Sequence, residues 1–416
     1  MNSQDKNYSV AIVGGGIIGL SIALTLQESG ENVLLIDKNT IASGASRGNA
    51  GHIATEQVFP IASLSILAQV PKMLLDPLSP LRLDWKYFPT IFPWLMRLIS
   101  NMRPSKSLTI HQALKALNKP SLQAWEDFTK HWECQKYLRT QGSLLITEDK
   151  HHIAKLQQEA NKLSSIGVPT QWLNQSEVHD YEPLLQEKIV GAILFPETGH
   201  IYNLDELLEH LKSTFIRLGG QLQENTEIFS IQQQNEKFVL SSQGKNFISS
   251  RIIIATGAYS KKWVKALTGI TVPLDTERGY HLMLPEHTNL LSIPVTSYEK
   301  RFIMTPMEQG LRLAGTVEYA GLEAPPNMQR AHQLYSLAKS LLKPTLSNNH
   351  CKEWMGFRPS IADSLPVIDR KNRIIFAFGH QHLGLTQAPI TANLVHQLYF
   401  NKPTSINLNA YRLDRF

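Results

Sequence analysis

The sequence is poor in cysteine, with only Cys134 and Cys351 among 416 residues. Two cysteines exclude a disulfide framework and a cysteine-rich metal site, and we expect no metal ion. No stretch offers about 18 uninterrupted apolar residues, so we predict no membrane-spanning helix. The formal net charge is +6, but no run of lysine and arginine accounts for it, which argues against nucleic acid as a partner.

The chain is too long for one simple core, and its 416 residues suggest two domains. Apolar residues make up 42% and charged residues 18%, the balance of an ordinary globular protein. The scarcity of cysteine fits a reducing compartment, so we expect a cytoplasmic protein.

The stretch Val10–Asp37 carries the strongest motif. Gly14, Gly16 and Gly19 have G-x-G-x-x-G spacing, after a β-branched strand pattern and before a helical one. Such glycines permit a tight turn, let the backbone approach a pyrophosphate, and let helix and strand pack closely. Asp37 ends the next strand, where a carboxylate can accept hydrogen bonds from a ribose. The pattern predicts a dinucleotide site at a helix N-terminus, the alternative being an ordinary glycine-rich turn.

The next segment, Ile41–His52, consists almost entirely of small and polar side chains. Such a run cannot form a core element, but it can pass closely beneath a large planar ligand and offer backbone N–H groups and hydroxyls. A nicotinamide enzyme of the simple doubly wound type would continue here with another strand and helix. The run therefore favours a flavin over NAD.

Two later segments have the same character. A run of isoleucines ends in Ala255-Thr256-Gly257, which is typical of a buried parallel strand that stops beside a cofactor. Near the C-terminus, the strand pattern Ile374–Phe378 meets Gly379-His380-x-x-x-Gly384-x-Thr386 and then a helix.

Together with Gly356-x-Arg358-Pro359, these segments resemble the D-amino-acid oxidase/dehydrogenase (DAO) family of FAD enzymes over essentially the full length. The strings Arg278–His281 and Gly379–His382 most resemble bacterial membrane-associated D-amino-acid dehydrogenases, including forms that act on D-hydroxyproline or D-proline. The resemblance implies an α/β fold. A two-dinucleotide-type, Rossmann-like FAD-binding domain is interleaved with a substrate domain of mixed β-sheet and helices. We expect the FAD-binding domain to comprise residues 1–58, 200–265 and 352–416, and the substrate domain residues 59–199 and 266–351.

The resemblance also implies which residues contact FAD, with Ile228 meeting the adenine through its backbone. Neither cysteine lies in a cofactor motif, so we expect noncovalent FAD. The predicted cofactor-binding residues are Gly14, Gly16, Ile17, Ile18, Gly19, Asp37, Lys38, Ser43, Ala45, Ser46, Asn49, Ala50, Gly51, His52, Ile228, Ala255, Thr256, Gly257, Gly379, His382, Leu383, Gly384, Leu385 and Thr386.

The activity implied by the resemblance is oxidation of an amino acid at Cα, with a hydride passing to flavin N5. This reaction needs a neutral amine, an aligned Cα–H bond and a held carboxylate. Arginine holds a carboxylate bidentately, and we predict this role for Arg358, the alternative being a structural pair with Asp363. Tyr280 is predicted to give a hydroxyl to the carboxylate or the amine, or else to be a plain sheet residue.

His52 and His382 end small-residue motifs that should border the flavin ring system. Either histidine suits tuning of the flavin charge or uptake of the ammonium proton, because imidazole titrates near neutral pH. Each is alternatively a structural hydrogen-bonder. Arg301 and His281 are further candidates.

The apolar, proline-broken region 58–106 has two patches, residues 63–75 and 87–99, and Arg97, Arg103 and Lys106 border the second. It is either an interfacial surface with basic residues at its rim or a helical part that packs on its own sheet. The first reading favours a dehydrogenase that passes electrons to a membrane quinone or respiratory carrier, peripheral on the inner face of the cell membrane. The alternatives are a soluble oxidase of the glycine/sarcosine type that uses O₂, and the flavin subunit of a hetero-oligomeric dehydrogenase. We expect the first.

Overall fold

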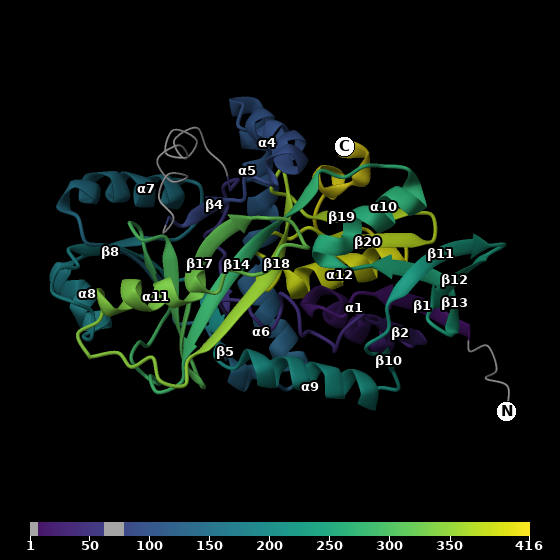
Figure 1. The fold of residues 1–416 in the computed structure, drawn as a ribbon, viewed down its shortest axis with the longest axis horizontal. Helices are drawn as coiled ribbons and strands as arrows, with labels where there is room; N and C mark the ends of the chain where they lie inside the picture. The colour runs from purple at the N-terminus through teal and green to yellow at the C-terminus, as the bar shows by residue number, and fades with distance from the viewer. Residues whose placement is uncertain (1–6, 62–78) are drawn as a thin grey trace.

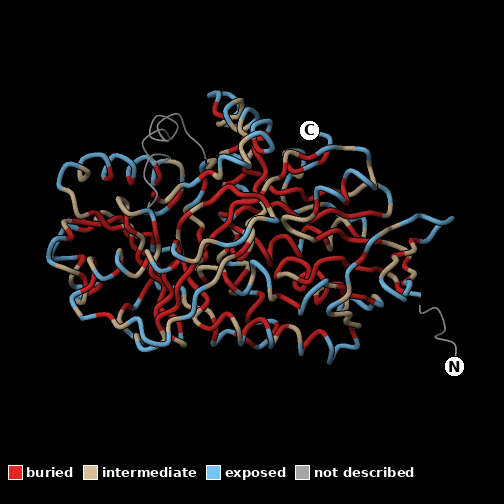
Figure 2. The backbone as a smooth tube through the Cα atoms, in the orientation of Figure 1, coloured by how far each residue is buried: buried red, intermediate tan, exposed pale blue. Residues whose placement is uncertain are grey.

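Two large β-sheets organise the chain, and they lie side by side with helices around them (Figure 1). The computed structural model describes residues 7–61 and 79–416. The buried parts of the backbone run through both sheets, whereas exposed segments gather on the outer helices and turns (Figure 2). The predicted α/β class is confirmed.

The first sheet contains the glycine motif, and β1 lies parallel to both β2 and β13. β20 adds in parallel beyond β13, while β11, β12 and β19 pair antiparallel. Helices cover both faces, which explains the continuous apolar runs in its central strands. The strands are β1 (Asn7–Val13), β2 (Val33–Ile36), β10 (Gln221–Gln223), β11 (Ile228–Gln234), β12 (Lys237–Ser242), β13 (Lys245–Ile254), β19 (Val367–Lys371) and β20 (Ile374–Phe378).

The second sheet is mostly antiparallel. Residues 352–361, the start of the expected last FAD-binding segment, form β18, which pairs with β14 in this sheet. The string with Arg358 therefore belongs to a strand of the second sheet. The strands are β4 (Leu81–Leu83), β6 (Ser143–Thr147), β7 (Gln171–Asn174), β8 (Gly191–Phe195), β14 (Leu274–Leu284), β15 (Val295–Ser297), β16 (Phe302–Met307), β17 (Gly310–Tyr319) and β18 (Lys352–Ile361).

A small third sheet joins distant parts of the chain, because β9 (Gly199–Ile201) pairs with both β3 (His52–Ile53) and β5 (Leu138–Arg139). The helices are α1 (Ile17–Glu28), α4 (Phe88–Asn101), α5 (Pro104–Asn118), α6 (Ser121–His131), α7 (Ile153–Ser165), α8 (Gln175–Tyr181), α9 (Leu204–Arg217), α10 (Ser260–Thr268), α11 (Gln329–Lys339) and α12 (Ala388–Tyr399).

The segment 108–132 looks like one helix in the sequence, but the structure divides it between α5 and α6. The break falls at Lys119 and Pro120. Proline has no N–H to donate, and it disfavours the helical conformation of the residue before it.

Helix α4 projects from the top of the molecule in Figure 1. It buries Ile91 and Trp94, and the Trp94 indole donates a hydrogen bond to the Ser360 carbonyl oxygen at 3.1 Å. Its other side leaves Phe92 and Met96 about half exposed, at 47% and 49%. The patch 63–75 lies outside the described residues. None of the helices within residues 7–61 and 79–416 has the length and apolar character needed to cross a lipid bilayer.

Candidate active site

One cavity of about 680 Å³ collects motifs that lie far apart in the sequence, and residues of both large sheets line it. The glycine turn, the small-residue run and the Ala-Thr-Gly turn meet there with the C-terminal glycine motif. The predicted cofactor residues that line the cavity are Gly14, Gly16, Ile17, Ile18, Asp37, Lys38, Ser43, Ala45, Ser46, Asn49, Ala50, His52, Ile228, Ala255, Thr256, Gly257, Gly379, His382, Gly384 and Leu385.

Four predicted cofactor residues pack beside the cavity without lining it: Gly19, Gly51, Leu383 and Thr386. A Cβ on Gly19 would collide with the carbonyl oxygen of Gly14, so this glycine serves the close packing of helix and strand. The Thr386 hydroxyl accepts a hydrogen bond from the Ala54 N–H at 2.9 Å. For these four residues, the predicted contact with FAD stays a prediction.

The N-terminus of α1 fits a bound diphosphate. Gly14 has a φ of 106°, and a Cβ there would collide with the Ala255 backbone, so only glycine allows this turn. Gly16 caps the helix without a side-chain hydrogen bond, and the first turn contains no acidic residue. Ser46 comes from the small-residue run, and its hydroxyl accepts the Ile17 N–H at 2.8 Å. The positive end of the helix dipole thus opens on the cavity, as an anion requires.

Asp37 lies at this end with both carboxylate oxygens engaged by the backbone. Oδ2 accepts the Gly15 N–H at 2.7 Å, and Oδ1 accepts the Asn39 N–H at 2.8 Å. Burial raises the pKa of Asp37 in spite of these two bonds. Each oxygen keeps a second lone pair, so the carboxylate can still accept from ribose hydroxyls.

Two buried side chains of the second sheet hold the small-residue run in place. The Arg312 guanidinium donates to the Asn49 carbonyl oxygen at 2.6 Å. His281 lies 3.0 Å from the Gly48 carbonyl oxygen through Nδ1, and its ring stacks on Trp354 with centroids 5.1 Å apart. Burial, with help from Arg312, lowers the pKa of His281 to about 3, so a neutral imidazole donates this bond. Our sequence reasoning missed Arg312, although an arginine inside an apolar strand was a signal.

Arg358 lies partly buried in the same cavity, on β18. One guanidinium nitrogen donates to the Thr316 carbonyl oxygen at 3.1 Å. The guanidinium passes over Gly279, where any Cβ would collide with it. The structural alternative does not hold, because Asp363 pairs with Arg415 at 2.8 Å instead. Most of the Arg358 fork therefore remains available for a ligand.

Glu277 lies across from Arg358, on β14, and our sequence reasoning missed it. It is buried at 3% exposure and lines the cavity. Its Oε1 accepts hydrogen bonds from the Ser360 hydroxyl at 2.6 Å and the Tyr319 hydroxyl at 3.1 Å. The sequence did contain a signal for Glu277. Residues two apart in a strand share one face, so residue 277 faces the same way as Gly279.

Tyr280 lines the cavity, and its predicted contact with the substrate stays a prediction. Its hydroxyl donates to the Glu318 carboxylate at 2.5 Å and accepts the Asn327 N–H at 3.2 Å. Its ring packs in the apolar core of the second sheet with Leu282 and Leu334. These contacts favour the sheet-residue alternative over contact with a substrate.

His52 is held at both ring nitrogens. Nδ1 lies 3.1 Å from the Gly199 carbonyl oxygen, and Nε2 lies 3.1 Å from a carboxylate oxygen of Glu56. Burial by itself would lower the pKa of His52, but the Glu56 charge and these hydrogen bonds outweigh it and raise the pKa. The same pair lowers the pKa of Glu56 against its burial. His52 thus lines the cavity with no ring nitrogen turned towards it.

His382 is the histidine whose side chain is exposed to the cavity. Desolvation by the surrounding protein, followed by the positive charge of Arg358, lowers the pKa of His382 to about 4. The imidazole is therefore neutral at pH 7. Its neighbour Gln381 has a φ of 55°, and three other non-glycine residues with positive φ also line the cavity: Ala42, Arg301 and Thr316. Strained backbone of this kind gathers where a fold holds a ligand.

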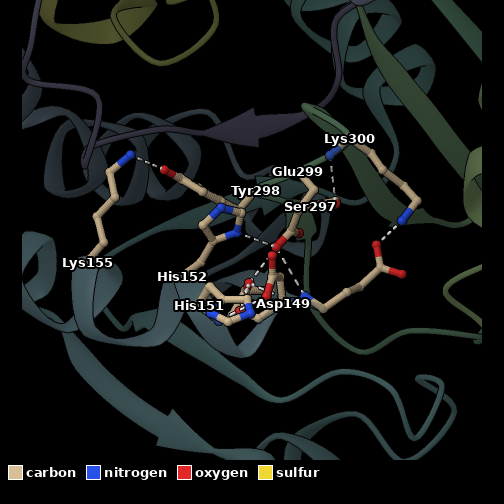
Figure 3. Close-up of polar contacts among 10 residues, drawn as sticks. Asp149, His151, His152, Lys155, Ser297, Tyr298, Glu299 and Lys300 are labelled. Atoms are coloured by element: carbon tan, nitrogen blue, oxygen red, sulfur yellow. Dashed lines mark hydrogen bonds and ion pairs between the residues drawn. The ribbon is translucent and has the colours of Figure 1, made fainter. Parts of the chain in front are cut away.

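Arg301 lies at the end of the turn between β15 and β16, and it lines the cavity. A polar network fixes this turn from the other side (Figure 3). Glu299 lies 3.1 Å from the His152 ring nitrogen, the Lys155 ammonium donates to the Tyr298 hydroxyl at 2.6 Å, and Lys300 pairs with Glu148. The turn is therefore held in one position at the cavity wall.

Comparison with known proteins agrees with this geometry. Residues 9–398 match the family model described as FAD dependent oxidoreductase (DAO). A D-amino-acid oxidase of Bradyrhizobium diazoefficiens is 30% identical, with 98% of both chains covered. A D-amino acid dehydrogenase of Vibrio atlanticus is 24% identical over 98% of this chain and 99% of its own. The crystal structure of glycine oxidase from Geobacillus kaustophilus shares the fold, with a TM-score of 0.76 at 22% identity and 99% of both chains covered. This chain belongs to the DAO family of FAD-dependent oxidoreductases, and FAD is its cofactor.

Proposed function

We propose that this chain is an FAD-dependent dehydrogenase of a small D-amino acid, with cyclic substrates such as D-proline or D-hydroxyproline among those it takes. The observation that carries the proposal is Arg358, whose guanidinium lies in the same cavity as the glycine turn. Arginine is the side chain best suited to hold a carboxylate bidentately. The names of the Bradyrhizobium and Vibrio relatives support an amino acid of D configuration.

Bound FAD supplies the oxidant, because its N5 accepts a hydride from the substrate Cα. Arg358 fixes the carboxylate, which limits the substrate to orientations in which the Cα–H bond can point at the flavin. His382, neutral at pH 7, serves as a hydrogen-bonding group beside the reactants, because a pKa of about 4 makes it a poor acceptor for the ammonium proton.

The electron acceptor in this proposal is a membrane quinone or another respiratory carrier, met at the inner face of the cell membrane. The surface of α4 supports it, because the helix exposes Phe92, Met96 and Arg97. Two further exposed cations, Arg103 and Lys106, follow where α5 begins. Such a surface inserts apolar side chains among lipid headgroups while cations meet anionic lipids.

A soluble oxidase that uses O₂ is the second candidate, and the Bradyrhizobium relative named as an oxidase favours it. Oxygen consumption and reduction of a soluble quinone should be compared with the same substrate, with and without anionic vesicles. The dehydrogenase predicts fast quinone reduction, slow oxygen uptake, and vesicle binding that is lost in Phe92→Ser/Met96→Ser. Rapid oxygen uptake that vesicles leave unchanged would establish the oxidase instead.

The substrate class is tested by flavin bleaching without air. The purified holoenzyme is mixed with a panel of D- and L-amino acids and with N-methylglycine. We expect rapid bleaching with small D-amino acids, D-proline among them. If no amino acid bleaches the flavin, although dithionite does, the proposal fails.

A further inference from the structure

A second charged group stands beside Arg358 in the cavity. Glu277 and Arg358 are directly paired residues on the antiparallel strands β14 and β18. Paired residues of neighbouring strands put their side chains on the same face of the sheet, so both charges belong to one wall. Both residues line the cavity.

The two oxygens of Glu277 have different surroundings. Oε1 is fixed by the hydroxyls of Ser360 and Tyr319, at 2.6 Å and 3.1 Å. Within the part of the chain that the structure describes, Oε2 accepts no hydrogen bond. A carboxylate that is 3% exposed and keeps one unused oxygen has an energetic reason to bind a cation.

Arg358 does not pair with this free oxygen of Glu277. Arg358 donates to the Thr316 carbonyl oxygen, and no ion pair within 4.0 Å joins it to Glu277 among the described residues. The two charges nevertheless act on each other, because Glu277 opposes the effect of burial on the pKa of Arg358. The Arg358 guanidinium and the Glu277 carboxylate thus belong to one wall of the cavity without forming an ion pair with each other.

We propose that Glu277 binds the ammonium group of the substrate while Arg358 binds its carboxylate. The inference rests on the function proposed above and names the second half of the recognition site. In an α-amino acid zwitterion, the ammonium and the carboxylate groups are both attached to Cα. Such a molecule fits between a cation and an anion on neighbouring strands. The pair selects α-amino acids over hydroxy acids and simple carboxylic acids, which offer no positive charge to Glu277.

The same contact affects the chemistry of the bound amine. A carboxylate beside the ammonium stabilises its charged form and raises its pKa. Hydride transfer requires the neutral amine, so Glu277 moves the acidic limb of the flavin-reduction rate to higher pH. Removal of the Glu277 charge should move that limb to lower pH. A residue that only supports the fold would leave the limb in place.

The test compares ligands with and without the amine in the holoenzyme. D-Alanine and D-proline are paired with propionate and cyclopentanecarboxylate, which have the same carboxylate and a similar shape. Substrate binding is read from the rate of anaerobic bleaching, and binding of the simple acids from the flavin absorption shift. In Glu277→Gln we expect amino-acid binding to weaken roughly 10- to 100-fold, with the simple acids unchanged or tighter. The acidic limb of flavin reduction should move to lower pH in the same variant.

The matched control is Glu353→Gln, an exposed carboxylate on β18 that pairs with His332 and should leave both ligand classes unaffected. Equal weakening of both classes in Glu277→Gln, or an unmoved pH limb, would overturn the proposal. If this variant loses its flavin, the wild-type enzyme still tests the proposal. Propionate that binds the wild-type enzyme as tightly as D-alanine does would also overturn the proposal. Wild-type flavin that no amino acid bleaches would instead defeat the proposed function.

Discussion

The two ends of the cavity are built from different chemical groups. The cofactor end consists of backbone and small side chains, with Gly14 and Ser46 at the start of α1. The opposite end carries charged groups, Arg358 and Glu277, on neighbouring strands of the second sheet. A diphosphate needs close approach to N–H groups, whereas a small zwitterion needs two separate charges. Added side-chain volume should therefore weaken flavin binding at the first end, and removal of a charge should weaken amino-acid binding at the second.

The largest effect is expected from Gly19→Ala at the cofactor end. The new methyl group would collide with the Gly14 carbonyl oxygen, and neither the strand nor the helix can move away easily. Overpacking of this kind costs roughly 1–3 kcal/mol, and here it also displaces the turn that faces the diphosphate. We expect loss of bound flavin, measured as the ratio of flavin to protein absorbance, and a lower Tm.

Gly44→Ala is the matched control for that variant, because Gly44 lines the cavity and an added Cβ there meets no atom within 4 Å. It should retain its flavin. If both variants keep full flavin, the cofactor end tolerates volume and the contrast between the two ends is wrong.

The next effect belongs to the charged end. Arg358→Ala should raise KM for the amino acid and lower kcat/KM roughly 30-fold to several thousand-fold, because a buried charged hydrogen-bond partner is worth about 2–5 kcal/mol. Flavin content should remain that of the wild type. Arg358→Lys keeps the positive charge and loses the bidentate guanidinium. Its kcat/KM should therefore lie between that of the wild type and that of Arg358→Ala. An unchanged KM in the alanine variant would remove Arg358 from the substrate site.

Asp37→Ala tests whether a single charge matters at the end built from backbone. Its loss leaves the Gly15 and Asn39 N–H groups without their acceptor and removes the predicted ribose contact. We expect FAD to bind about 5- to 150-fold more weakly, the equivalent of roughly 1–3 kcal/mol. Equilibrium dialysis with absorbance measures the retained flavin, and Asp37→Asn should lose less. Full occupancy after dialysis would contradict the ribose assignment.

The two ends also differ in how far the sequence predicts them. Motifs close in sequence, such as the glycine turn, are fixed by local backbone geometry, and the structure confirms their strands and helices. The partner of Asp363 is Arg415, which comes from the distant C-terminal turn, and the position of the Tyr280 hydroxyl depends on strand register in a sheet of distant segments. Glu277 was hidden for the same reason. Only the pairing of β14 with β18 brings it next to Arg358.

The smallest predicted effect concerns His52 and Glu56, a buried pair that also lines the cavity. The raised pKa of His52 contributes stability that is complete below its ordinary pKa, about 6.5, and is lost as pH rises through the folded value. The lowered pKa of Glu56 contributes stability above its ordinary value, about 4.3, and loses it as pH falls. The pair should stabilise most between about pH 4.5 and 6.5.

In that pH range the Tm gap between wild type and Glu56→Gln should be widest. It should narrow by roughly 1–2 °C as the pH rises past the folded pKa of His52, because wild type then loses the charged pair. Glu28→Gln is the control, since its pair with His131 is exposed and contributes little at any pH. A gap that stays constant from pH 5 to 9 would mean that His52 remains neutral. Glu56 would then act through its hydrogen bond alone.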